Sequence, residues 1–442
     1  MAPSSGSQII EALCKLVVGL GLAFWLGKQG KDPDVAAAGA ITGVTVGTVV
    51  ALAYMVLDFL LSRGREDIRG TDRPDSAGSI LANILKIAVP ITLSSSMVGI
   101  VTVIDSALVQ GQIQKVLISD PDSWALYQQV VDFAPLEAAR DAWQQAVSSG
   151  AAAEAVSQLY GAVELAAENI SRSLYGNYSG ALTIYNLPLS LMAAITASVI
   201  AAVSAALARR DRRGAARITG SALRLTALLA FPMGVGLFVL GPPIIRLIFP
   251  ELDASVAGPL LSTLGIASIF VCLMLVCNSV LQAHGFINLP VVIMALGGVV
   301  KIVTNDSLVA VPTIGSAGAP VGNVLCVGLC IVQDLVVIAR VIHGRPDYLP
   351  LLAKPAAAAG VMGLGAWAVY GLLSKLLSYE EVTQVGETIQ TLGKTGNGIA
   401  VMGAILIAVI IYAVLVVALR AISREDLSLM PTGDKIAKIL RL

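Results

Sequence analysis

The sequence predicts an all-α polytopic membrane protein with about ten transmembrane helices. Of its 442 residues, 56% are hydrophobic and 13% are charged, and the mean hydropathy is +0.82. Soluble domains carry about 25% charged residues, so the composition places this chain in a bilayer. The apolar residues also occur in runs of about 20 or more, the length that a helix needs to cross the hydrocarbon core.

The expected spans follow one another along most of the chain, and the glycines and prolines inside them are tolerated in membrane helices. They cover residues 9–27, 35–61, 84–110, 177–208, 216–248, 255–281, 289–310, 318–343, 352–374 and 398–420. Arginine and lysine are concentrated in the segments that follow the second, fourth, eighth and tenth spans. The positive-inside rule therefore predicts that both termini are cytoplasmic.

A motif occurs twice and indicates an internal repeat. Ala38-Gly39-Ala40-x-x-Gly43 opens the second span, and Ala317-Gly318-Ala319-x-x-Gly322 opens the eighth. The span before each motif carries a lysine, Lys15 or Lys301. The period of six spans is even, so the two copies share one orientation, and the axis that relates them runs along the membrane normal.

The repeat predicts how the chain is divided. The first copy contributes only its last two helices, so we expect its first four to be missing from this sequence. The expected parts are an incomplete N-terminal lobe at 1–62, a cytoplasmic loop at 63–83, a complete six-helix lobe at 84–345, and two further helices with a cytoplasmic tail at 346–442.

An acidic insertion at 111–176 separates the third span from the fourth, on the extracytoplasmic side of the predicted topology. Val163, Ala167 and Ile170 belong to a set of apolar residues at helical spacing, which predicts an amphipathic helix. Two interpretations remain open for this insertion. It either rests on the outer rim of the bundle or docks an extracytoplasmic partner.

The residues that most chemistry requires are few. Two histidines and five cysteines provide no metal-ligand spacing and no catalytic triad, and no phosphate-binding glycine loop is present. Lysine plus arginine equals aspartate plus glutamate at 29 each, so bulk charge gives no attraction to nucleic acid. We therefore expect no cofactor, no metal, no nucleic-acid partner and no enzymatic activity.

Buried charges are the candidate functional groups, because a charge at the centre of a membrane helix costs about 2.5–3.5 kcal/mol. Lys301 lies deep in its span, with Asn305 one turn later on the same face. Either Lys301 pairs with a carboxylate, Asp306 or Asp105, and holds helices together, or it faces a wet cavity and binds an anionic group of the substrate. Asp105 is itself a candidate gate or cation site.

Lys15 has Glu11 four residues earlier, so this pair either neutralises itself or leaves Lys15 to act with Lys301. Two facing cations suit a diphosphate. Asn186 either hydrogen-bonds sugar hydroxyls or bridges helices.

Several segments resemble the stage V sporulation protein B and polysaccharide-biosynthesis branch of the multidrug/oligosaccharidyl-lipid/polysaccharide (MOP, MATE-like) exporter superfamily. The resemblance covers nearly the whole chain apart from the insertion and the last twenty residues. The motifs that carry it are Pro90-Ile-Thr-Leu-Ser-Ser-Ser, Ile104-Asp-Ser-Ala-Leu-Val, Tyr185-Asn-Leu-Pro188, Gly297-Gly-Val-Val-Lys-Ile-Val and Gly318-Ala-Pro-Val-Gly. Lipid II flippases resemble the chain at Tyr185 to Pro188 but carry an Asp-Arg pair where this chain has Leu182 and Thr183.

The resemblance implies a two-lobe bundle of fourteen helices, of which this chain lacks the first four. It also implies a flippase in the bacterial inner membrane that moves polyprenyl-diphosphate-linked saccharides, such as polysaccharide or peptidoglycan precursors, by alternating access among membrane lipids. The last two spans would then shelter the lipid tail. The alternatives are a cation-coupled multidrug exporter of the same superfamily, with Asp105 and Asp306 as its acidic site, or a truncated remnant without transport activity.

Overall fold

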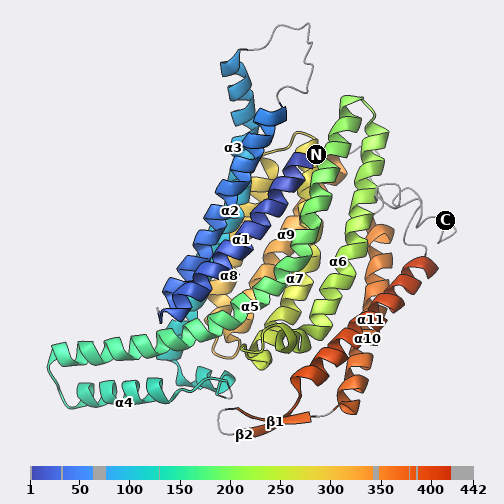
Figure 1. Cartoon of the computed structure of the whole chain (residues 1–442). Helices are drawn as coiled ribbons and strands as arrows, with labels where there is room; N and C mark the ends of the chain where they lie inside the picture. The colour runs from blue at the N-terminus through green and yellow to red at the C-terminus, as the bar shows by residue number, and fades with distance from the viewer. Residues whose placement is uncertain are drawn as a thin grey trace. The chain divides into compact units, whose positions relative to one another are not determined.

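The chain folds into long helices, as expected for an all-α membrane protein (Figure 1). The computed structural model describes residues 2–30, 33–62, 76–128, 130–341, 348–377, 379–384 and 387–419. It divides into two compact units, Met1–Ile80 and Leu81–Leu442. The helices are α1 (Ala2–Lys28), α2 (Pro33–Ser62), α3 (Ala77–Ser119), α4 (Ala134–Ser148), α5 (Ala153–Ala208), α6 (Arg212–Ile248), α7 (Ala254–Ala283), α8 (Leu289–Val309), α9 (Gly318–Val341), α10 (Tyr348–Leu376) and α11 (Lys394–Ala418).

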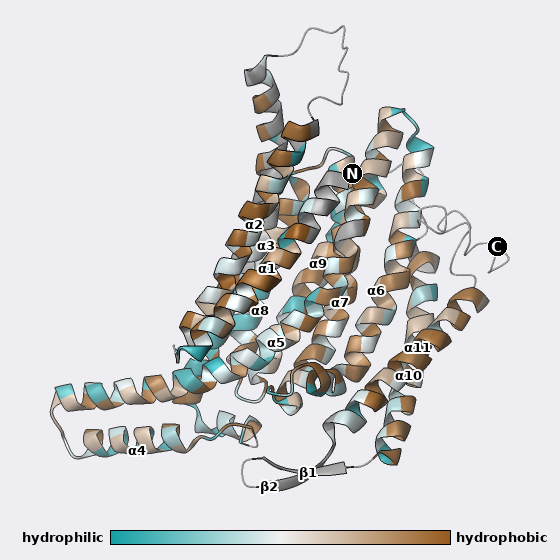
Figure 2. Ribbon diagram, viewed as in Figure 1, coloured by the Kyte–Doolittle hydropathy of each residue, from teal (hydrophilic) through white to brown (hydrophobic). Residues whose placement is uncertain are grey.

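Nine helices of the described part are long and apolar enough to cross a membrane, and they match nine of the ten expected spans. The remaining expected span, 84–110, lies in α3, where many side chains are outside the described residues. Figure 2 shows hydrophobic residues along α6, α10 and α11, and hydrophilic residues along α4. The chain is therefore a multi-pass membrane protein.

Two elements differ from the expected loops. Helix α3 begins at Ala77, so the end of the expected loop 63–83 is helical. Between α10 and α11 the chain forms an antiparallel hairpin of β1 (Tyr379–Gln384) and β2 (Glu387–Leu392). This hairpin is a local feature of a connecting segment and leaves the fold class unchanged.

The ends and bends of the helices follow from local chemistry. Asp211 caps α6 by accepting a hydrogen bond from the Gly214 backbone N–H at 2.8 Å. Pro242 and Pro243 lack an N–H donor, and the helix loses its regular geometry just before them, at Leu240. The resulting kink in α6 lies beside an apolar pocket described below.

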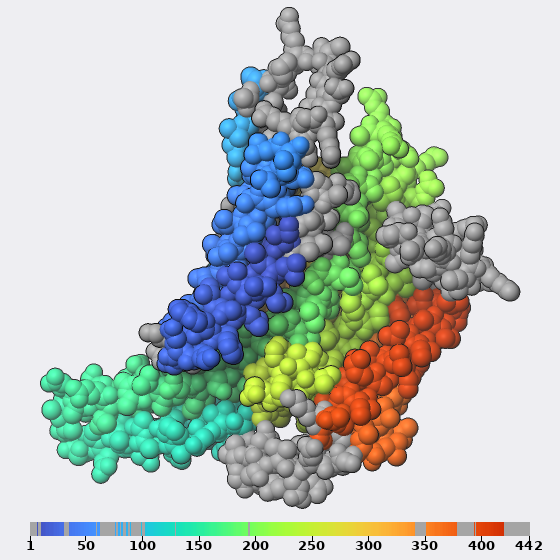
Figure 3. Space-filling model, viewed as in Figure 1, coloured from blue at the N-terminus to red at the C-terminus, as the bar shows by residue number. Residues whose placement is uncertain are grey.

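The acidic insertion is largely helical. It contains the end of α3, the 3-10 helix η1 (Pro121–Leu126), α4 and the first part of α5. Figure 3 shows α4 and the first part of α5 packed along each other. Val163 and Ala167, two of the predicted apolar residues, are 2% and 0% exposed, so the amphipathic helix is confirmed.

A tyrosine fixes the base of this insertion to the bundle. The Tyr127 hydroxyl accepts a hydrogen bond from the backbone N–H of Ser316 at 2.7 Å and donates one to the Ser316 hydroxyl at 3.1 Å. Ser316 belongs to the 3-10 helix η2 (Gly315–Ala317), which precedes α9. The preceding Gly315 has φ +53°, and a Cβ there would overlap the Tyr127 hydroxyl, so glycine suits this contact.

Candidate functional site

A buried ion pair joins α3 to α8. The Lys301 ammonium lies 2.9 Å from Asp105 Oδ2, and the two side chains are only 9% and 3% exposed. Of the two alternatives for Lys301, this conformation shows the paired one, with Asp105 rather than Asp306 as the partner. A buried pair is stable only when its remaining lone pairs and protons are also satisfied, so the neighbours of Asp105 are decisive.

Three further polar side chains complete what we call the polar cluster: Asp105, Tyr178, Lys301, Asn305 and Asn323. The Asn305 amide donates to Asp105 Oδ1, and the Tyr178 hydroxyl donates to Asp105 Oδ2 at 3.4 Å. The Asn323 amide donates in turn to the Tyr178 hydroxyl at 2.7 Å. The polar cluster therefore connects four helices, α3, α5, α8 and α9, inside an apolar bundle.

The spacing on α8 explains how the sequence builds this cluster. Lys301 and Asn305 are four residues apart, so both face the same carboxylate. On the facing helix α9, the motif residue Gly322 lies against the Asn305 amide, and a Cβ there would overlap the Asn305 Oδ1 atom. A small residue at this position lets α9 come close to α8, as is common between membrane helices.

The polar cluster leaves Asp105 without a free place for a metal cation in this conformation, because an ammonium and two hydrogen-bond donors already surround it. The described residues also contain no group of three histidine, cysteine, aspartate or glutamate side chains that could hold a metal. The geometry thus gives no support to Asp105 as a site for a coupling metal ion.

Lys15 pairs with Glu11, which is one of the two alternatives predicted for it from the sequence. Its ammonium lies 2.6 Å from Glu11 Oε1 one turn earlier on α1, and the two side chains are 38% and 28% exposed. This pair lies within one helix of the N-terminal unit. Its charges are neutralised within α1, and the Thr48 hydroxyl of α2 donates a hydrogen bond to Glu11 Oε1 at 3.4 Å.

The other two predicted site residues lie outside the polar cluster. Asp306 is exposed and accepts a hydrogen bond from the Gln112 amide. It lies five residues after Lys301, which places it on a different side of α8. Asn186 is exposed on α5, next to residues that line an apolar pocket.

Sequence reasoning missed three buried polar residues. Tyr178 and Asn323 gave no signal, because single tyrosines and asparagines are ordinary in membrane helices. Asp334 did give one, since it is a carboxylate inside the eighth expected span. The cost that singled out Lys301 applies equally to Asp334.

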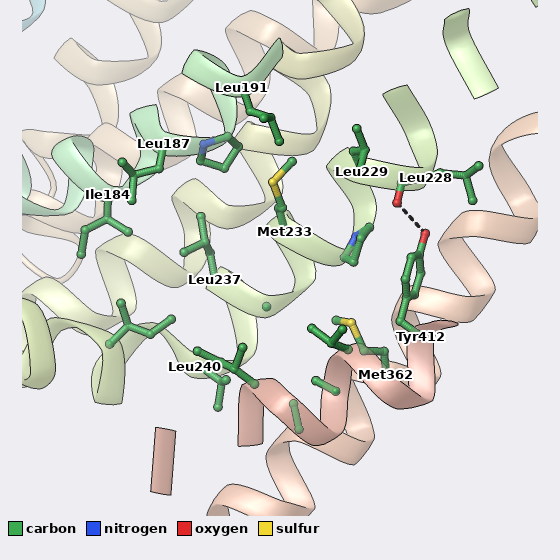
Figure 4. Close-up of a pocket in the computed structure, with 18 residues that line it drawn as sticks. Ile184, Leu187, Leu191, Leu228, Leu229, Met233, Leu237, Leu240, Met362 and Tyr412 are labelled. Carbon is green, nitrogen blue, oxygen red and sulfur yellow. Dashed lines mark hydrogen bonds between the residues drawn. The ribbon is translucent and has the colours of Figure 1, made fainter. Parts of the chain in front are cut away.

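An apolar groove of about 500 Å³ lies between α5 and α6 on one side and α10 and α11 on the other (Figure 4). Ile184, Leu187, Met233 and Met362 are among its lining residues. The Tyr412 hydroxyl is the one polar side-chain group in its lining, and it donates to the Leu228 carbonyl at 2.8 Å, so it presents no free donor. The groove therefore suits a hydrocarbon chain rather than a polar ligand.

Comparison with known proteins identifies the family. Residues 153–385, more than half of the chain, match the family described as lipid II flippase MurJ. The chain belongs to this family. MurJ is a family of flippases, which move lipids rather than catalyse reactions. The match covers α5 to α10 and so includes three of the four helices that line the groove, α5, α6 and α10.

Relatives of this MurJ family member include an uncharacterized membrane protein, YabM, of Bacillus subtilis (strain 168). It is 23% identical over 448 aligned positions, which cover 100% of this chain and 70% of YabM. Two solved structures are also similar. A MOP superfamily transporter from Pyrococcus furiosus has a TM-score of 0.40 and 13% identity, covering 81% of this chain and 69% of its own. A multidrug resistance MATE family transporter has a TM-score of 0.36 and 14% identity, with the same coverages.

The superfamily expected from the sequence motifs is confirmed by the family match. The narrower placement in the stage V sporulation branch stays a prediction, as does the division of the chain into lobes.

Proposed function

We propose that this protein is a flippase for polyprenyl-diphosphate-linked saccharides that works by alternating access. The observation that carries the proposal is the apolar groove between α5, α6, α10 and α11. An isoprenoid tail is a long hydrocarbon, and the apolar groove would hold this tail while the headgroup crosses the membrane. Membership of the MurJ family supports the same substrate class.

The polar cluster provides the candidate cation for the headgroup. A diphosphate needs positive charge, and Lys301 is a buried cation in the bundle. In this conformation the Lys301 ammonium is paired with Asp105. Headgroup binding therefore requires this ion pair to separate, so that the diphosphate replaces Asp105 as the partner of Lys301. Lys15 would exchange Glu11 for a phosphate in the same way. Asn186, Asn305 and Asp306 then contact the saccharide or gate the path to it.

The proposed cellular setting is the bacterial inner membrane, with both termini in the cytoplasm. The positive-inside distribution of arginine and lysine supports it. In this topology the α4–α5 hairpin is extracytoplasmic, where its acidic surface would rest on the rim of the bundle or meet an extracytoplasmic partner.

The groove can be tested by filling it. Gly236 lines the groove, and a Cβ there meets no atom within 4 Å, so Gly236→Phe places a ring in the groove without a backbone clash. Gly360 of α10 is equally open but does not line the groove, which makes Gly360→Phe the matched control. In proteoliposomes with a fluorescent polyprenyl-diphosphate-linked saccharide, the first variant should lose flipping and the control should retain it. Equal activity of both variants would refute the tail site.

The role of Lys301 can be separated from its structural pairing. Lys301→Ala alone should abolish complementation of a flippase-deficient strain, but it also leaves Asp105 buried without its cation, so its loss of activity does not separate binding from pairing. The double variant Lys301→Met with Asp105→Asn removes both charges, so no unpaired charge stays buried. If Lys301 binds the diphosphate, the double variant folds but does not transport. Restored transport would show that the lysine only balances Asp105.

A further inference from the structure

A second buried carboxylate, Asp334 on α9, has no hydrogen-bond partner among the residues that the structure describes. Its exposed fraction is 0%, and neither carboxylate oxygen makes a hydrogen bond. Asp105 is similarly buried but has an ammonium and two donors around it. An ionised carboxylate buried without a cation or a hydrogen-bond donor from the protein is highly unfavourable, so these surroundings favour the protonated form of Asp334.

The titratable groups that interact electrostatically with Asp334 are two thiols, Cys277 of α7 and Cys330 of α9. Both cysteines are buried, and neither supplies a positive charge. The nearest cation of the neighbouring helix α8, Lys301, is bound to Asp105. Among the described residues, no cation or hydrogen-bond donor is therefore seen to compensate a negative charge on Asp334.

Helices α7 and α9 each carry a further buried polar atom that has no hydrogen bond among the described residues. The side-chain oxygens of Asn278 and Gln333, the residues next to Cys277 and Asp334 in sequence, are buried and make no hydrogen bond. Buried polar atoms almost always make hydrogen bonds. Several buried oxygens without a hydrogen bond on two adjoining helices therefore indicate a second conformation in which these oxygens gain hydrogen-bond donors. Water entering between α7 and α9 would provide them.

One face of α9 connects this carboxyl to the polar cluster. Gly322, Cys326, Cys330 and Asp334 follow one another at intervals of four residues, so they lie along one side of the helix. Gly322 packs on Asn305, and Cys326 interacts electrostatically with Lys301. Asp334 is two turns further on, about 12 Å along the same helix. A shift of α9 that hydrates Asp334 therefore also disturbs the contacts of Lys301.

We propose that Asp334 is a proton-binding site, protonated in this conformation and deprotonated when water enters between α7 and α9, so that transport is coupled to a proton. The step breaks the O–H bond of the carboxyl, transfers the proton to the entering water and leaves a hydrated carboxylate. A proton is the ligand that fits, because a metal cation would need several more oxygen ligands. The coupling rests on the flippase function proposed above, whereas the protonation does not.

The protonation can be measured directly by infrared difference spectroscopy on the purified chain at neutral pH. The carbonyl stretch of a protonated carboxyl should be present in the wild type and lost in Asp334→Asn, which keeps the shape of a neutral carboxyl. Asp141→Asn is the matched control, since Asp141 is exposed on α4 and lies outside the polar cluster and the groove. Retention of the band in Asp334→Asn would overturn the proposal.

The coupling is measured in proteoliposomes with a fluorescent polyprenyl-diphosphate-linked saccharide and an imposed pH gradient. The wild type and Asp141→Asn should be accelerated by the gradient, whereas Asp334→Asn should flip at a rate that the gradient does not change. An equal response of Asp334→Asn and wild type would overturn the coupling. If no variant moves the saccharide, the proposed function fails, and the infrared band still decides whether Asp334 binds a proton.

Discussion

Two helix pairs, α1–α2 and α8–α9, carry the repeated motif and pack in the same way, although their lysines have different partners. In the first pair, the motif residue Gly39 lies against Leu22, seven residues after Lys15. In the second, Gly318 lies against Leu308, seven residues after Lys301. The same register therefore holds in both pairs.

The second glycine of each motif repeats the correspondence. Gly43 of α2 packs on Gly19, four residues after Lys15, and Gly322 of α9 packs on Asn305, four residues after Lys301. The two pairs thus share one helix–helix contact built on small residues. At this position the first pair has a glycine and the second has an amide that donates to Asp105.

The partners of the lysines set the two pairs apart. Lys15 binds Glu11 within its own helix and stays partly exposed, and among the described residues this ion pair is linked to α2 by a hydrogen bond from the Thr48 hydroxyl to Glu11 Oε1 at 3.4 Å. Lys301 binds Asp105 of another helix and is buried, so its ion pair ties α3 to α8. The same repeated helix pair can therefore carry either a partly exposed ion pair within one helix or a buried ion pair between two helices.

The largest expected effect comes from removing the acidic partner. Asp105→Ala leaves the Lys301 ammonium buried and unpaired, so we expect it to lower the free energy of unfolding by about 3–5 kcal/mol. Glu11→Ala leaves a lysine that can turn toward water, with a loss of about 1 kcal/mol or less. Denaturant unfolding in detergent, followed by tryptophan fluorescence, measures both. Equal losses in the free energy of unfolding would mean that the buried and the partly exposed ion pair contribute equally to stability.

A smaller effect is expected where the two pairs are alike. Gly43→Ala and Gly322→Ala both place a Cβ in occupied space, at the Gly19 backbone and the Asn305 amide, so each should cost about 1–3 kcal/mol by the same measurement. Gly328→Ala is the control, because a Cβ there meets only Phe270, at 3.9 Å. It should be neutral or slightly stabilising, since alanine favours helix. A Gly43→Ala variant with an unchanged free energy of unfolding would show that the α1–α2 contact is not equivalent to the α8–α9 contact.

The smallest expected effect is at the edge of the polar cluster. Tyr178→Phe removes the hydroxyl between Asp105 and Asn323, and we expect a loss of about 1 kcal/mol. Tyr160→Phe, at an exposed hydroxyl of the α4–α5 hairpin, should stay within about 0.5 kcal/mol. In the N-terminal pair the corresponding outer donor is the Thr48 hydroxyl, 3.4 Å from Glu11 Oε1. A Tyr178→Phe variant as stable as wild type would show that such an outer hydroxyl adds nothing to the stability of the buried pair.

The sequence was a good guide to the helices and to the repeat, because both depend on local patterns. Apolar runs long enough to span a bilayer can be read directly, and the Ala-Gly-Ala-x-x-Gly motif marks where two helices approach closely. The sequence was a poorer guide to which side chains form ion pairs and hydrogen bonds with each other. Asp306 and Asp105 were equal candidates for Lys301, and only the helical rotation of α8 and the position of α3 selected Asp105.

The sequence by itself determined that this chain is a multi-pass helical membrane protein with a repeated helix pair, since composition and spacing are properties of the chain alone. The tertiary structure decided which charges neutralise each other. Among the described residues it gives Asp334 no opposite charge and no hydrogen-bond donor. Asp105 and Asn305 are 200 residues apart and meet only because helices pack side by side. Such contacts depend on the rotation and translation of whole helices, which no short stretch of sequence encodes.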